Sequence, residues 1–486
     1  MADPDAQSNK KTCKTLLLKF GGTSVGSPDA MRQAAAIIQE ERPKWERIIA
    51  VVSAMNGVTN TLIACAQAAL DCKTAEYQEH IAKLRQRHFE AIRALAPQEL
   101  QEGLCAVIDQ QLGTLKAFCD SIQVMGEVTP RGMDTISSLG ERMNAKIFSA
   151  CLQQIGLRSQ AVDAAGLIVT DGNFQNARPL LDFTCRQVSA KLQPMLEQGI
   201  IPVVTGFIGA TEDGITTTLG RGGSDYSASL LADCLDASEV WNCTDVDGVM
   251  TADPNIVPDA RVIPELTYDE MSEMAYFGAK VLHPKTIQPI VSKNIPLRVM
   301  NTFNPSHPGT RISSQSDALR GKLTSVSGIK NLSIFTIEGR GMLGVPGVAA
   351  RTFGAVAEVG ASVLMISQSS SEQSICFVVP AEVEEKVQAA LLRSLGSEIE
   401  RGDINGIQIH SDVVIITVIG SGMRQTPGVS ARVFNALGSR MINVIAIAQG
   451  SSEYSISLVV DSQDAKLAIQ QLHQEVIING NKPTQN

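Results

Sequence analysis

Apolar and polar positions follow two different periods between Leu16 and about Ile312. Short apolar runs rich in β-branched residues are typical of buried strands, and they alternate with longer segments that have helical spacing. We expect strands at Ile48–Val52, Ile201–Thr205, Glu239–Trp241 and Leu297–Val299. We expect helices at Met31–Glu41, Asn60–Leu70, Gln78–Leu95, Gly140–Ile155, Ser227–Leu235 and Tyr268–Ala275. This alternation predicts an α/β fold, with a mainly parallel sheet covered by helices on both faces.

Two long stretches depart from the alternation. Asn60–Leu157 contains almost no strand pattern and is interpreted as a helical insertion. Residues 313–328 are rich in Ser and Gly, which indicates a linker. The pattern therefore predicts a first domain over residues 15–312 that is separated from the rest of the chain.

An internal repeat follows the linker. The segment Met342–Phe353 recurs 81 residues later as Met423–Phe434, and Ile366–Glu372 recurs as Ile447–Glu453. Each copy has the pattern strand, turn, helix, two strands, helix, so we expect two small α/β modules over residues 329–400 and 401–486. Exposed sheet edges on such modules favour pairing with a second copy of the chain, so a homodimer or larger assembly is expected.

The same repeat argues against a cofactor role for one glycine motif. Gly339–Gly344 matches G-x-G-x-x-G, a pattern found in dinucleotide-binding folds. The corresponding segment Gly420–Gln425 lacks the third glycine, and neither copy is long enough for half of such a fold. We therefore expect no dinucleotide cofactor.

Composition and charge exclude several classes of partner. The chain has 486 residues, with 41 basic and 50 acidic side chains and a formal net charge of −9. This balance provides no positive field for nucleic acid or an anionic membrane surface.

The polar start of the chain does not resemble a signal peptide, and no window is apolar enough to span a bilayer, so a cytoplasmic protein is expected. The ten cysteines form no Cys-x-x-Cys pair and are expected to be reduced thiols, and no metal site is expected.

A glycine-rich turn follows the first strand. Lys19–Ser24 has the sequence Lys-Phe-Gly-Gly-Thr-Ser. Gly21 and Gly22 allow the backbone to approach a ligand, and the N–H groups beyond them can bind phosphate oxygens beside the Lys19 ammonium. It is not a Walker A loop, because no Gly-Lys-Ser/Thr closes it. Alone, the motif could equally be an ordinary turn with a surface lysine.

Three later segments add candidate chemistry. Arg221 stands among glycines and is suited to a bidentate grip on a carboxylate or phosphate, whereas Ser224 and Asp225 could also be simple helix N-caps. Thr244–Pro254 is rich in carboxylates and suits a nucleotide pocket, although Asx turns would explain it too. Phe277–Pro284 adds Lys280, and its histidine, His283, is interpreted as structural rather than as a base.

Together, these motifs resemble the aspartokinases of the amino-acid kinase family. The resemblance rests on Lys19–Ser24, Gly220–Asp225, Thr244–Asp245 and Phe277–Lys280, and on two repeats that resemble a regulatory ACT pair. It runs in order over nearly the whole chain and implies an amino-acid kinase fold followed by two ferredoxin-like ACT modules. The ACT pair is most similar to that of threonine-sensitive bifunctional aspartokinase–homoserine dehydrogenases, and we expect the dehydrogenase half to be absent.

The resemblance also implies a reaction and a set of site residues. The reaction is phosphorylation of the β-carboxylate of L-aspartate by MgATP, the first step of lysine, threonine and methionine biosynthesis. The catalytic positions are Lys19, Asp225 and Lys280. The matching nucleotide positions are Lys19, Gly21, Gly22, Thr244, Asp245 and Lys280. The matching aspartate positions are Ser53, Thr59, Glu141 for the ammonium, Arg221 for the α-carboxylate, and Ser224.

Four positions depart from the usual family pattern. Asn242 and Cys243 stand where Ile-Trp is common, Met250 replaces a tyrosine, and Asn255 replaces an arginine. All four are expected on the nucleotide side of the site. Their effect on nucleotide binding is left open by the sequence.

The resemblance also suggests an effector. Lysine-sensitive relatives often carry an Asp where this chain has Leu364, and an aliphatic side chain cannot compensate a buried ammonium. Gln368 and Gln449 occupy matched positions in the two repeats and resemble residues that hydrogen-bond threonine, although solvated strand ends would also explain them. We therefore expect threonine to be the effector, with lysine less suited.

The absence of a paired nucleophile and base agrees with this chemistry. The aspartate β-carboxylate is ionised at neutral pH and can attack phosphorus without a general base.

Two alternatives to an aspartate kinase stay open. The acceptor could be another acid, as in glutamate 5-kinase or acetylglutamate kinase, or the chain could be a non-catalytic amino-acid sensor with the same fold.

Overall fold

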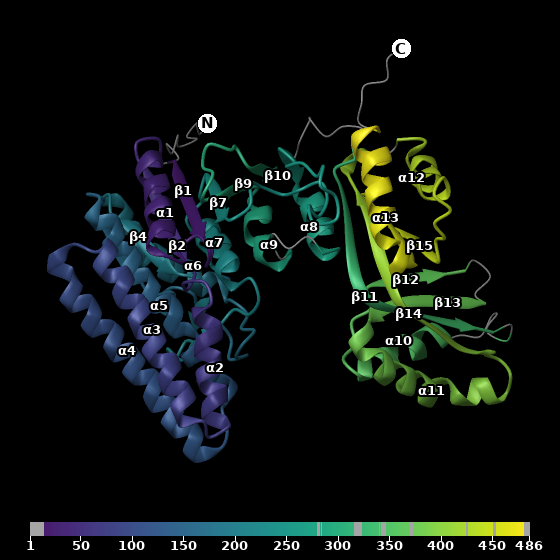
Figure 1. The fold of residues 1–486 in the computed structure, drawn as a ribbon, viewed down its shortest axis with the longest axis horizontal. Coiled ribbons are helices and arrows are strands. Elements are labelled where there is room, and N and C mark those ends of the chain that lie inside the picture. Colours follow the sequence, from purple (N-terminus) through teal and green to yellow (C-terminus); the bar gives the residue numbers. More distant parts are fainter. Residues whose placement is uncertain are drawn as a thin grey trace, which may run out of the picture. The chain divides into compact units, whose positions relative to one another are not determined.

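The computed structural model describes residues 14–278, 282, 284–314, 323–339, 341, 347–369, 373–423, 426–450 and 453–480. The chain divides into two compact units (Figure 1). Unit 1 comprises residues 1–249 and 282–314, and unit 2 comprises residues 250–281 and 315–486. The expected domain boundaries differ from this division at residues 250–281, and they stay a prediction.

A mostly parallel sheet forms the centre of unit 1. Its strands run β3-β4-β2-β1-β7-β9-β10, with β10 antiparallel to β9 and the other neighbours parallel. The strands are β1 (Thr15–Phe20), β2 (Arg47–Val52), β3 (Ser159–Val162), β4 (Ile201–Thr205), β7 (Glu239–Thr244), β9 (Leu297–Asn301) and β10 (Thr310–Ser313), and a separate hairpin joins β5 (Ile208–Ala210) to β6 (Thr216–Thr218). The expected α/β class and parallel sheet are confirmed.

Helices cover this sheet on both sides. The core on one side contains every second residue of β1, namely Leu16, Leu18 and Phe20, packed with side chains of α1, α2 and α5. Helices α6 and α7 also contact the sheet, at β2, but contribute no residue to this cluster. The helices are α1 (Pro28–Glu41), α2 (Val58–Leu70), α3 (Thr74–Leu95), α4 (Gln98–Met125), α5 (Pro130–Gln154), α6 (Leu181–Glu197), α7 (Gly223–Cys234) and α9 (Pro284–Ser292). The expected helical insertion is confirmed, because α2 to α5 pack together within one cluster.

An antiparallel sheet of six strands organises unit 2. The strand order is β12-β13-β11-β14-β16-β15. The strands are β11 (Ser325–Glu338), β12 (Met365–Gln368), β13 (Ser374–Pro380), β14 (Gly406–Ile419), β15 (Ala446–Gln449) and β16 (Ser455–Asp461). Unit 2 also contains a short strand, β8 (Glu265–Thr267), which is not part of this sheet. The helices are α8 (Tyr268–Tyr276), α10 (Val348–Glu358), α11 (Glu384–Glu400), α12 (Val429–Gly438) and α13 (Ser462–Leu472).

The two repeats in unit 2 exchange strand halves. Leu332–Glu338 of β11 pairs with β13, whereas Ser325–Ile329 pairs with Ile415–Ile419 of β14. Val413–Ile419 of β14 then pairs with β16. Each module therefore completes its four-stranded sheet with half of the other module's first strand. Strand β11 begins at Ser325, inside the segment that was expected to be linker.

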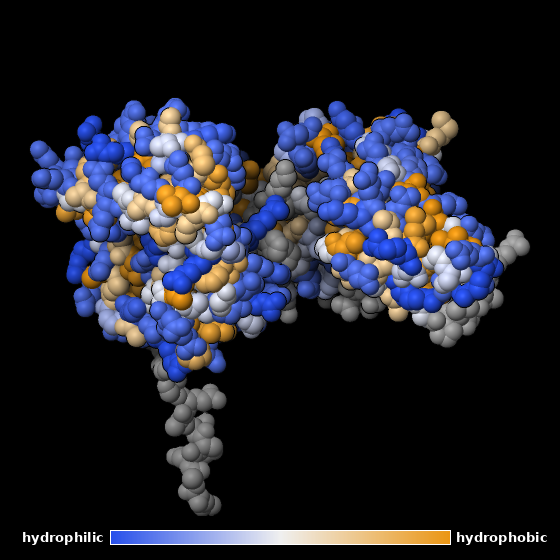
Figure 2. Space-filling view, turned by 90° about the horizontal axis from the view of Figure 1, so that it is seen from below, coloured by the Kyte–Doolittle hydropathy of each residue, from blue (hydrophilic) through white to orange (hydrophobic). Residues whose placement is uncertain are grey.

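Apolar side chains lie in separate cores of the two units. Clusters in unit 2 gather under α10 and α11 and under α12 and α13. The face drawn in Figure 2 is largely polar, with scattered apolar patches. Among the described residues, no helix combines the length and apolarity needed to cross a membrane. The cytoplasmic location stays a prediction.

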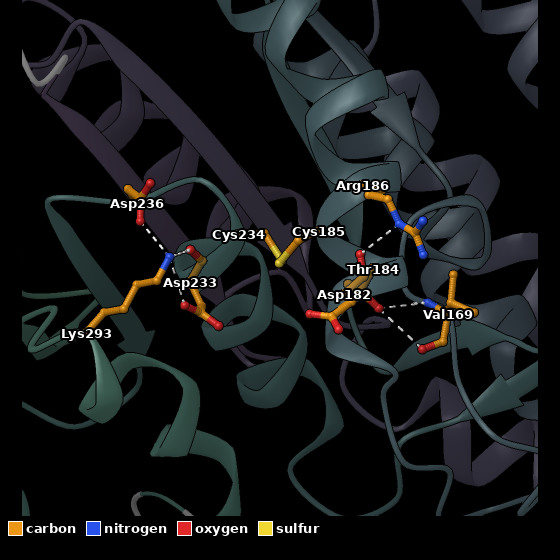
Figure 3. Close-up of a disulfide and its surroundings, with 9 residues drawn as sticks. All are labelled: Val169, Asp182, Thr184, Cys185, Arg186, Asp233, Cys234, Asp236 and Lys293. Carbon is orange, nitrogen blue, oxygen red and sulfur yellow. Dashed lines mark hydrogen bonds and ion pairs between the residues drawn. A yellow bond between two sulfur atoms is a disulfide. The ribbon is translucent and has the colours of Figure 1, made fainter. Parts of the chain in front are cut away.

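A disulfide joins two helices of unit 1, which corrects the expectation that every cysteine is a free thiol. Cys185 of α6 and Cys234 at the end of α7 are bonded, with their Cα atoms 4.7 Å apart (Figure 3). The two cysteines are 49 residues apart in sequence. They meet because α6 and α7 pack against one another, which cysteine spacing alone could not indicate. Cys65, Cys119 and Cys151 are buried free thiols, as expected.

The disulfide should stabilise the folded chain. Closing a loop of 49 residues restricts the unfolded state, so Cys185→Ser is expected to lower the free energy of unfolding by about 2–4 kcal/mol. The measurement is guanidinium unfolding without reductant. Cys72→Ser is the matched control, because Cys72 is an exposed free cysteine. An unfolding midpoint of the unmodified chain that does not move on adding reductant would contradict this prediction.

Candidate active site

The turn after β1 presents backbone N–H groups at the carboxyl end of the sheet. Gly21 N–H donates to the carbonyl of Cys243 on the neighbouring strand β7. A Cβ on Gly22 would lie 3.2 Å from the carbonyl oxygen of Ala54, so glycine permits this close approach. Within the part of the chain that the structure describes, the N–H groups of residues 22, 23 and 24 donate to no acceptor. The turn therefore offers consecutive free donors to an anion.

The Lys19 ammonium lies beside this turn and is held by two residues. It forms an ion pair with Asp225 at 2.6 Å and donates to Asn242 Oδ1 at 3.3 Å. Asn242 stands directly opposite Lys19 in the pairing of β1 with β7, and Asp225 lies in the first turn of α7. A Cβ on Gly21 would be 3.6 Å from Lys19 Nζ, so the turn and the ammonium are adjacent.

A cavity of about 320 Å³ opens in front of Lys19 and Asp225. It brings together expected site residues from four parts of unit 1: the end of β1, the loop after β2 with the start of α2, helix α5, and the loop before α7 with the first turn of that helix. The lining residues are Lys19, Ser53, Thr59, Glu141, Phe207, Gly220, Arg221, Gly222, Gly223, Ser224 and Asp225. The expected cluster of charged and hydroxyl side chains thus forms one pocket.

Glu141 carries the buried carboxylate of this pocket. Its side chain is buried, and Oε1 accepts a hydrogen bond from Ala54 N–H at 3.1 Å. Oε2 has no hydrogen-bond partner among the described residues. Burial raises the pKa of Glu141 to about 7, against the partial compensation of the Ala54 hydrogen bond and the Arg142 charge. Such a carboxylate is suited to receive a cation from the cavity.

Close packing explains why glycine precedes Glu141. A Cβ on Gly140 would lie 2.7 Å from the Ala54 Cβ, so only glycine lets α5 approach the loop that follows β2. Asn144, one turn further on, donates from Nδ2 to the carbonyl of Ser53 at 2.6 Å. Asn144 is a residue that the sequence analysis missed, and its only sequence signal is its helical spacing from Glu141.

The hydroxyl groups of the pocket connect two loops. Ser53 Oγ donates to Ser224 Oγ at 2.9 Å. A Cβ on Gly206 would be 2.6 Å from Ser224 Oγ, so this glycine allows the loop after β4 to pass close to α7. Phe207 also lines the pocket and was not expected from the sequence.

Arg221 differs from Lys19 in having no partner. Its side chain is exposed and forms no hydrogen bond or ion pair with the described residues, although it lines the cavity. Gly220 and Gly222 on either side have positive φ angles of 75° and 73°, which glycine adopts readily. The guanidinium is therefore available to a ligand.

Thr244 and Asp245 lie outside the cavity but at the same edge of the sheet. They follow β7, and Thr244 Oγ1 donates to Asp245 Oδ1 at 3.2 Å. The adjoining Cys243 is buried, and its carbonyl accepts from Ser24 Oγ as well as from Gly21 N–H. Asn255 is exposed and bonds to Asp253 within a turn. Lys280 and His283 lie outside the described residues.

The two candidate effector residues occupy equivalent places in unit 2. Gln368 ends β12 and Gln449 ends β15, and both side chains are exposed. Ser367 Oγ donates to the carbonyl of Ile447 at 3.1 Å, which brings the two outer strands together. The repeat therefore places both glutamines near the same junction.

Comparisons with known proteins agree with this architecture. The model of the amino acid kinase family matches residues 14–301, and the ACT domain model matches residues 335–395 and 416–476. Aspartokinase 2 of Arabidopsis thaliana is 35% identical over 486 residues, which cover 97% of this chain and 86% of that protein. The bifunctional aspartokinase/homoserine dehydrogenase of Haemophilus influenzae is 37% identical over 469 residues. The chain spans about half the length of such bifunctional relatives, 56% in that case.

Solved structures show the same similarity over nearly the whole chain. E. coli aspartokinase III in complex with aspartate and ADP matches with a TM-score of 0.79 and 29% identity, covering 95% of this chain and 100% of that one. The same enzyme in complex with lysine and aspartate matches with a TM-score of 0.76. The first structure is described as the R-state and the second as the T-state.

The buried carboxylate should make stability depend on pH. Because the pKa of Glu141 is raised to about 7, its contribution is fully present below its ordinary pKa and is lost as the pH rises through 7. Glu141→Gln cannot ionise, so at pH 8 this variant is expected to be more stable than the unmodified chain by about 3 kcal/mol. Urea unfolding at pH 5 and pH 8 measures the difference, which should be small at pH 5. Parallel pH profiles for the two chains would rule out an elevated pKa at Glu141.

Proposed function

Since the chain belongs to the amino acid kinase family, and within it to the aspartokinases with two ACT domains, we propose that it is an aspartate kinase. The proposed reaction transfers the γ-phosphoryl group of MgATP to the β-carboxylate of L-aspartate. The products are ADP and 4-phospho-L-aspartate.

The observation that carries this proposal is the charge pattern of the cavity. Among the described residues, one carboxylate oxygen of Glu141 and the guanidinium of Arg221 have no partner, and both residues line the same pocket. An amino acid presents an ammonium and an α-carboxylate, which match these two groups in sign. Ser53 and Thr59 add hydroxyl groups beside them. In this proposal the two charged residues bind the amino-acid end and leave the β-carboxylate directed at the phosphate.

The proposed mechanism needs no base. The β-carboxylate is already ionised near pH 7, so the protein has to bring two anions together in line and neutralise their charge. We propose that Lys19 and the N–H groups of residues 22–24, which donate to no described residue, bind the phosphate oxygens. If MgATP is bound, Asp225, the carboxylate beside Lys19, would hold the magnesium ion, which would lower the charge of the phosphates. Gly21, Thr244, Asp245 and Lys280 are proposed for the nucleotide side.

The first test is ADP production. We expect ATP turnover that requires L-aspartate and that falls at least about a hundredfold in Lys19→Ala, because the variant loses the positive charge at the phosphates. A coupled ADP assay measures both. Lys14→Ala is the matched control, since Lys14 is an exposed lysine just before β1, and it should retain full activity.

Other outcomes of this assay would decide between functions. Turnover with glutamate or N-acetylglutamate in place of aspartate would indicate another acceptor within the same fold. Binding of an amino acid with no ATP turnover would indicate a sensor. Near-normal ADP release by Lys19→Ala would remove this lysine from the mechanism.

We also propose threonine as the feedback effector, acting through the ACT domains. Leu364, at the position where lysine-sensitive relatives often carry Asp, is partly buried beside an apolar cluster that includes Met365 and Val378. Apolar side chains of this kind cannot compensate the charge of a buried ε-ammonium. Gln368 and Gln449 supply exposed amide groups that can bond to the hydroxyl and backbone groups of threonine. Self-association through the ACT domains stays a prediction.

Effector addition gives a direct test. Millimolar threonine is expected to inhibit the aspartate-dependent activity, whereas lysine at the same concentration should not. Gln368→Ala and Gln449→Ala are each expected to raise the inhibitory threonine concentration about tenfold, because each removes hydrogen bonds to the ligand. Steady-state assays with both amino acids decide the matter, and inhibition by lysine alone would show that the effector is wrongly assigned.

A further inference from the structure

Helix α5 carries a second buried carboxylate, seven residues before Glu141. Asp134 is 1% exposed and, unlike Glu141, is not among the residues that line the cavity. Its two oxygens accept hydrogen bonds from Gln175 N–H at 3.1 and 2.9 Å, from Thr218 N–H at 3.0 Å, and from Thr218 Oγ1 at 2.7 Å. All of these groups donate and Asp134 only accepts, which is the role an ionised carboxylate fills best.

The two partners of Asp134 belong to loops that lie far apart in sequence. Gln175 has a positive φ of 67°, a backbone conformation that residues with a side chain adopt only uncommonly. Thr218 ends β6, and its carbonyl accepts from Ala177 N–H at 2.9 Å. A Cβ on Gly220 would meet Asn176 Oδ1 and the Gln175 carbonyl at 3.0 Å. The two loops are therefore packed on one another, and Asp134 binds both.

This arrangement fixes the start of the loop that bears Arg221. Thr218 is held by Asp134, and the next residue, Leu219, donates from its N–H to the carbonyl of Phe207. Gly223 N–H donates to the Gly220 carbonyl, which joins the other end of the loop to helix α7. Arg221 itself bonds to no described residue, so its place depends on these anchors.

We propose that Asp134 is a positioning residue that sets the distance between Arg221 and Glu141 across the cavity. Glu141 and Asp134 stand on the same rigid helix, about 10 Å apart along its axis. Glu141 is placed directly by α5, and Arg221 is placed by α5 through Asp134 and Thr218. The proposal rests on the proposed function, because it assigns Arg221 and Glu141 to opposite ends of one amino-acid substrate.

The kinetic test uses Asp134→Asn. The amide turns one acceptor into an NH₂ donor that faces the N–H and hydroxyl donors, so the Arg221 loop should lose its fixed position. We expect the KM for aspartate to rise at least about tenfold, with kcat changed less and the KM for ATP unchanged. A general loss of folding would instead lower the apparent kcat and the thermal unfolding temperature and leave both KM values unchanged. An unchanged KM for aspartate in a folded Asp134→Asn protein would overturn the proposal.

Variants of Thr218 provide a matched series that leaves Asp134 in place. Thr218→Ser keeps both donors to the carboxylate and should retain the normal KM for aspartate. Thr218→Val keeps the N–H group but loses the hydroxyl, and should raise this KM by about threefold to tenfold. Equal KM values in the serine and valine variants would show that the hydroxyl bond does not position Arg221.

Hydrogen exchange tests the same contacts without any substrate. In Asp134→Asn, amides in residues 172–178 and 216–222 should exchange at least about tenfold faster, while those in β1 and β2 keep their rates. If exchange rises but the unmodified chain shows no aspartate-dependent turnover, the anchor is correct and the proposed function fails. If turnover requires aspartate but exchange in both loops is unchanged, the proposed function survives and the anchor is wrong.

Discussion

The ion pair between Lys19 and Asp225 connects the elements on which the site depends. Lys19 ends β1, Asp225 begins α7, and Asn242 on β7 completes the contacts of the ammonium. Side chains that are only 12% and 17% exposed lose much of their hydration, so such a pair stays favourable only with good geometry and further hydrogen bonds. The dipole of α7 favours a carboxylate in its first turn. The ion pair therefore places a lysine beside the glycine turn after β1 without leaving its charge uncompensated.

Helix α5 is the rigid element that supports the wall of the cavity containing Glu141. Gly140 allows it to pack against the loop after β2, Glu141 enters the cavity, and Asn144 holds the Ser53 carbonyl. Asp134 extends the same helix to the loops around Gln175 and Thr218. A helix suits this task because its side-chain positions are set by its own hydrogen bonds rather than by flexible loops. Helix α5 thus carries Glu141 into the cavity and also bonds, through Asp134, to the strand that leads into the Arg221 loop.

The exchanged strands of unit 2 impose a different constraint. Strand β11 pairs with β13 and β14, and β14 pairs with β11 and β16. Because these two strands belong to the sheets of both modules, one module cannot shift along them without breaking hydrogen bonds to the other. Helix α8 belongs to this unit, where Glu270 accepts from Ser421 N–H at 2.7 Å and Phe277 enters the cluster that contains Leu332. The segment expected to contribute Lys280 therefore begins on the regulatory unit.

The sequence alone indicated the parallel α/β sheet, the two repeats and most of the cavity, because strand periodicity, glycine turns and charged motifs are local signals. It indicated Lys19 and Arg221 by their glycine-rich motifs, and Glu141 only through the resemblance to the aspartokinases. Only the tertiary structure decided their relations, including the disulfide between Cys185 and Cys234, the exchanged halves of β11 and β14, and the anchor at Asp134. Each of these joins residues distant along the chain, and their contact depends on how helices and strands pack, which no local pattern encodes.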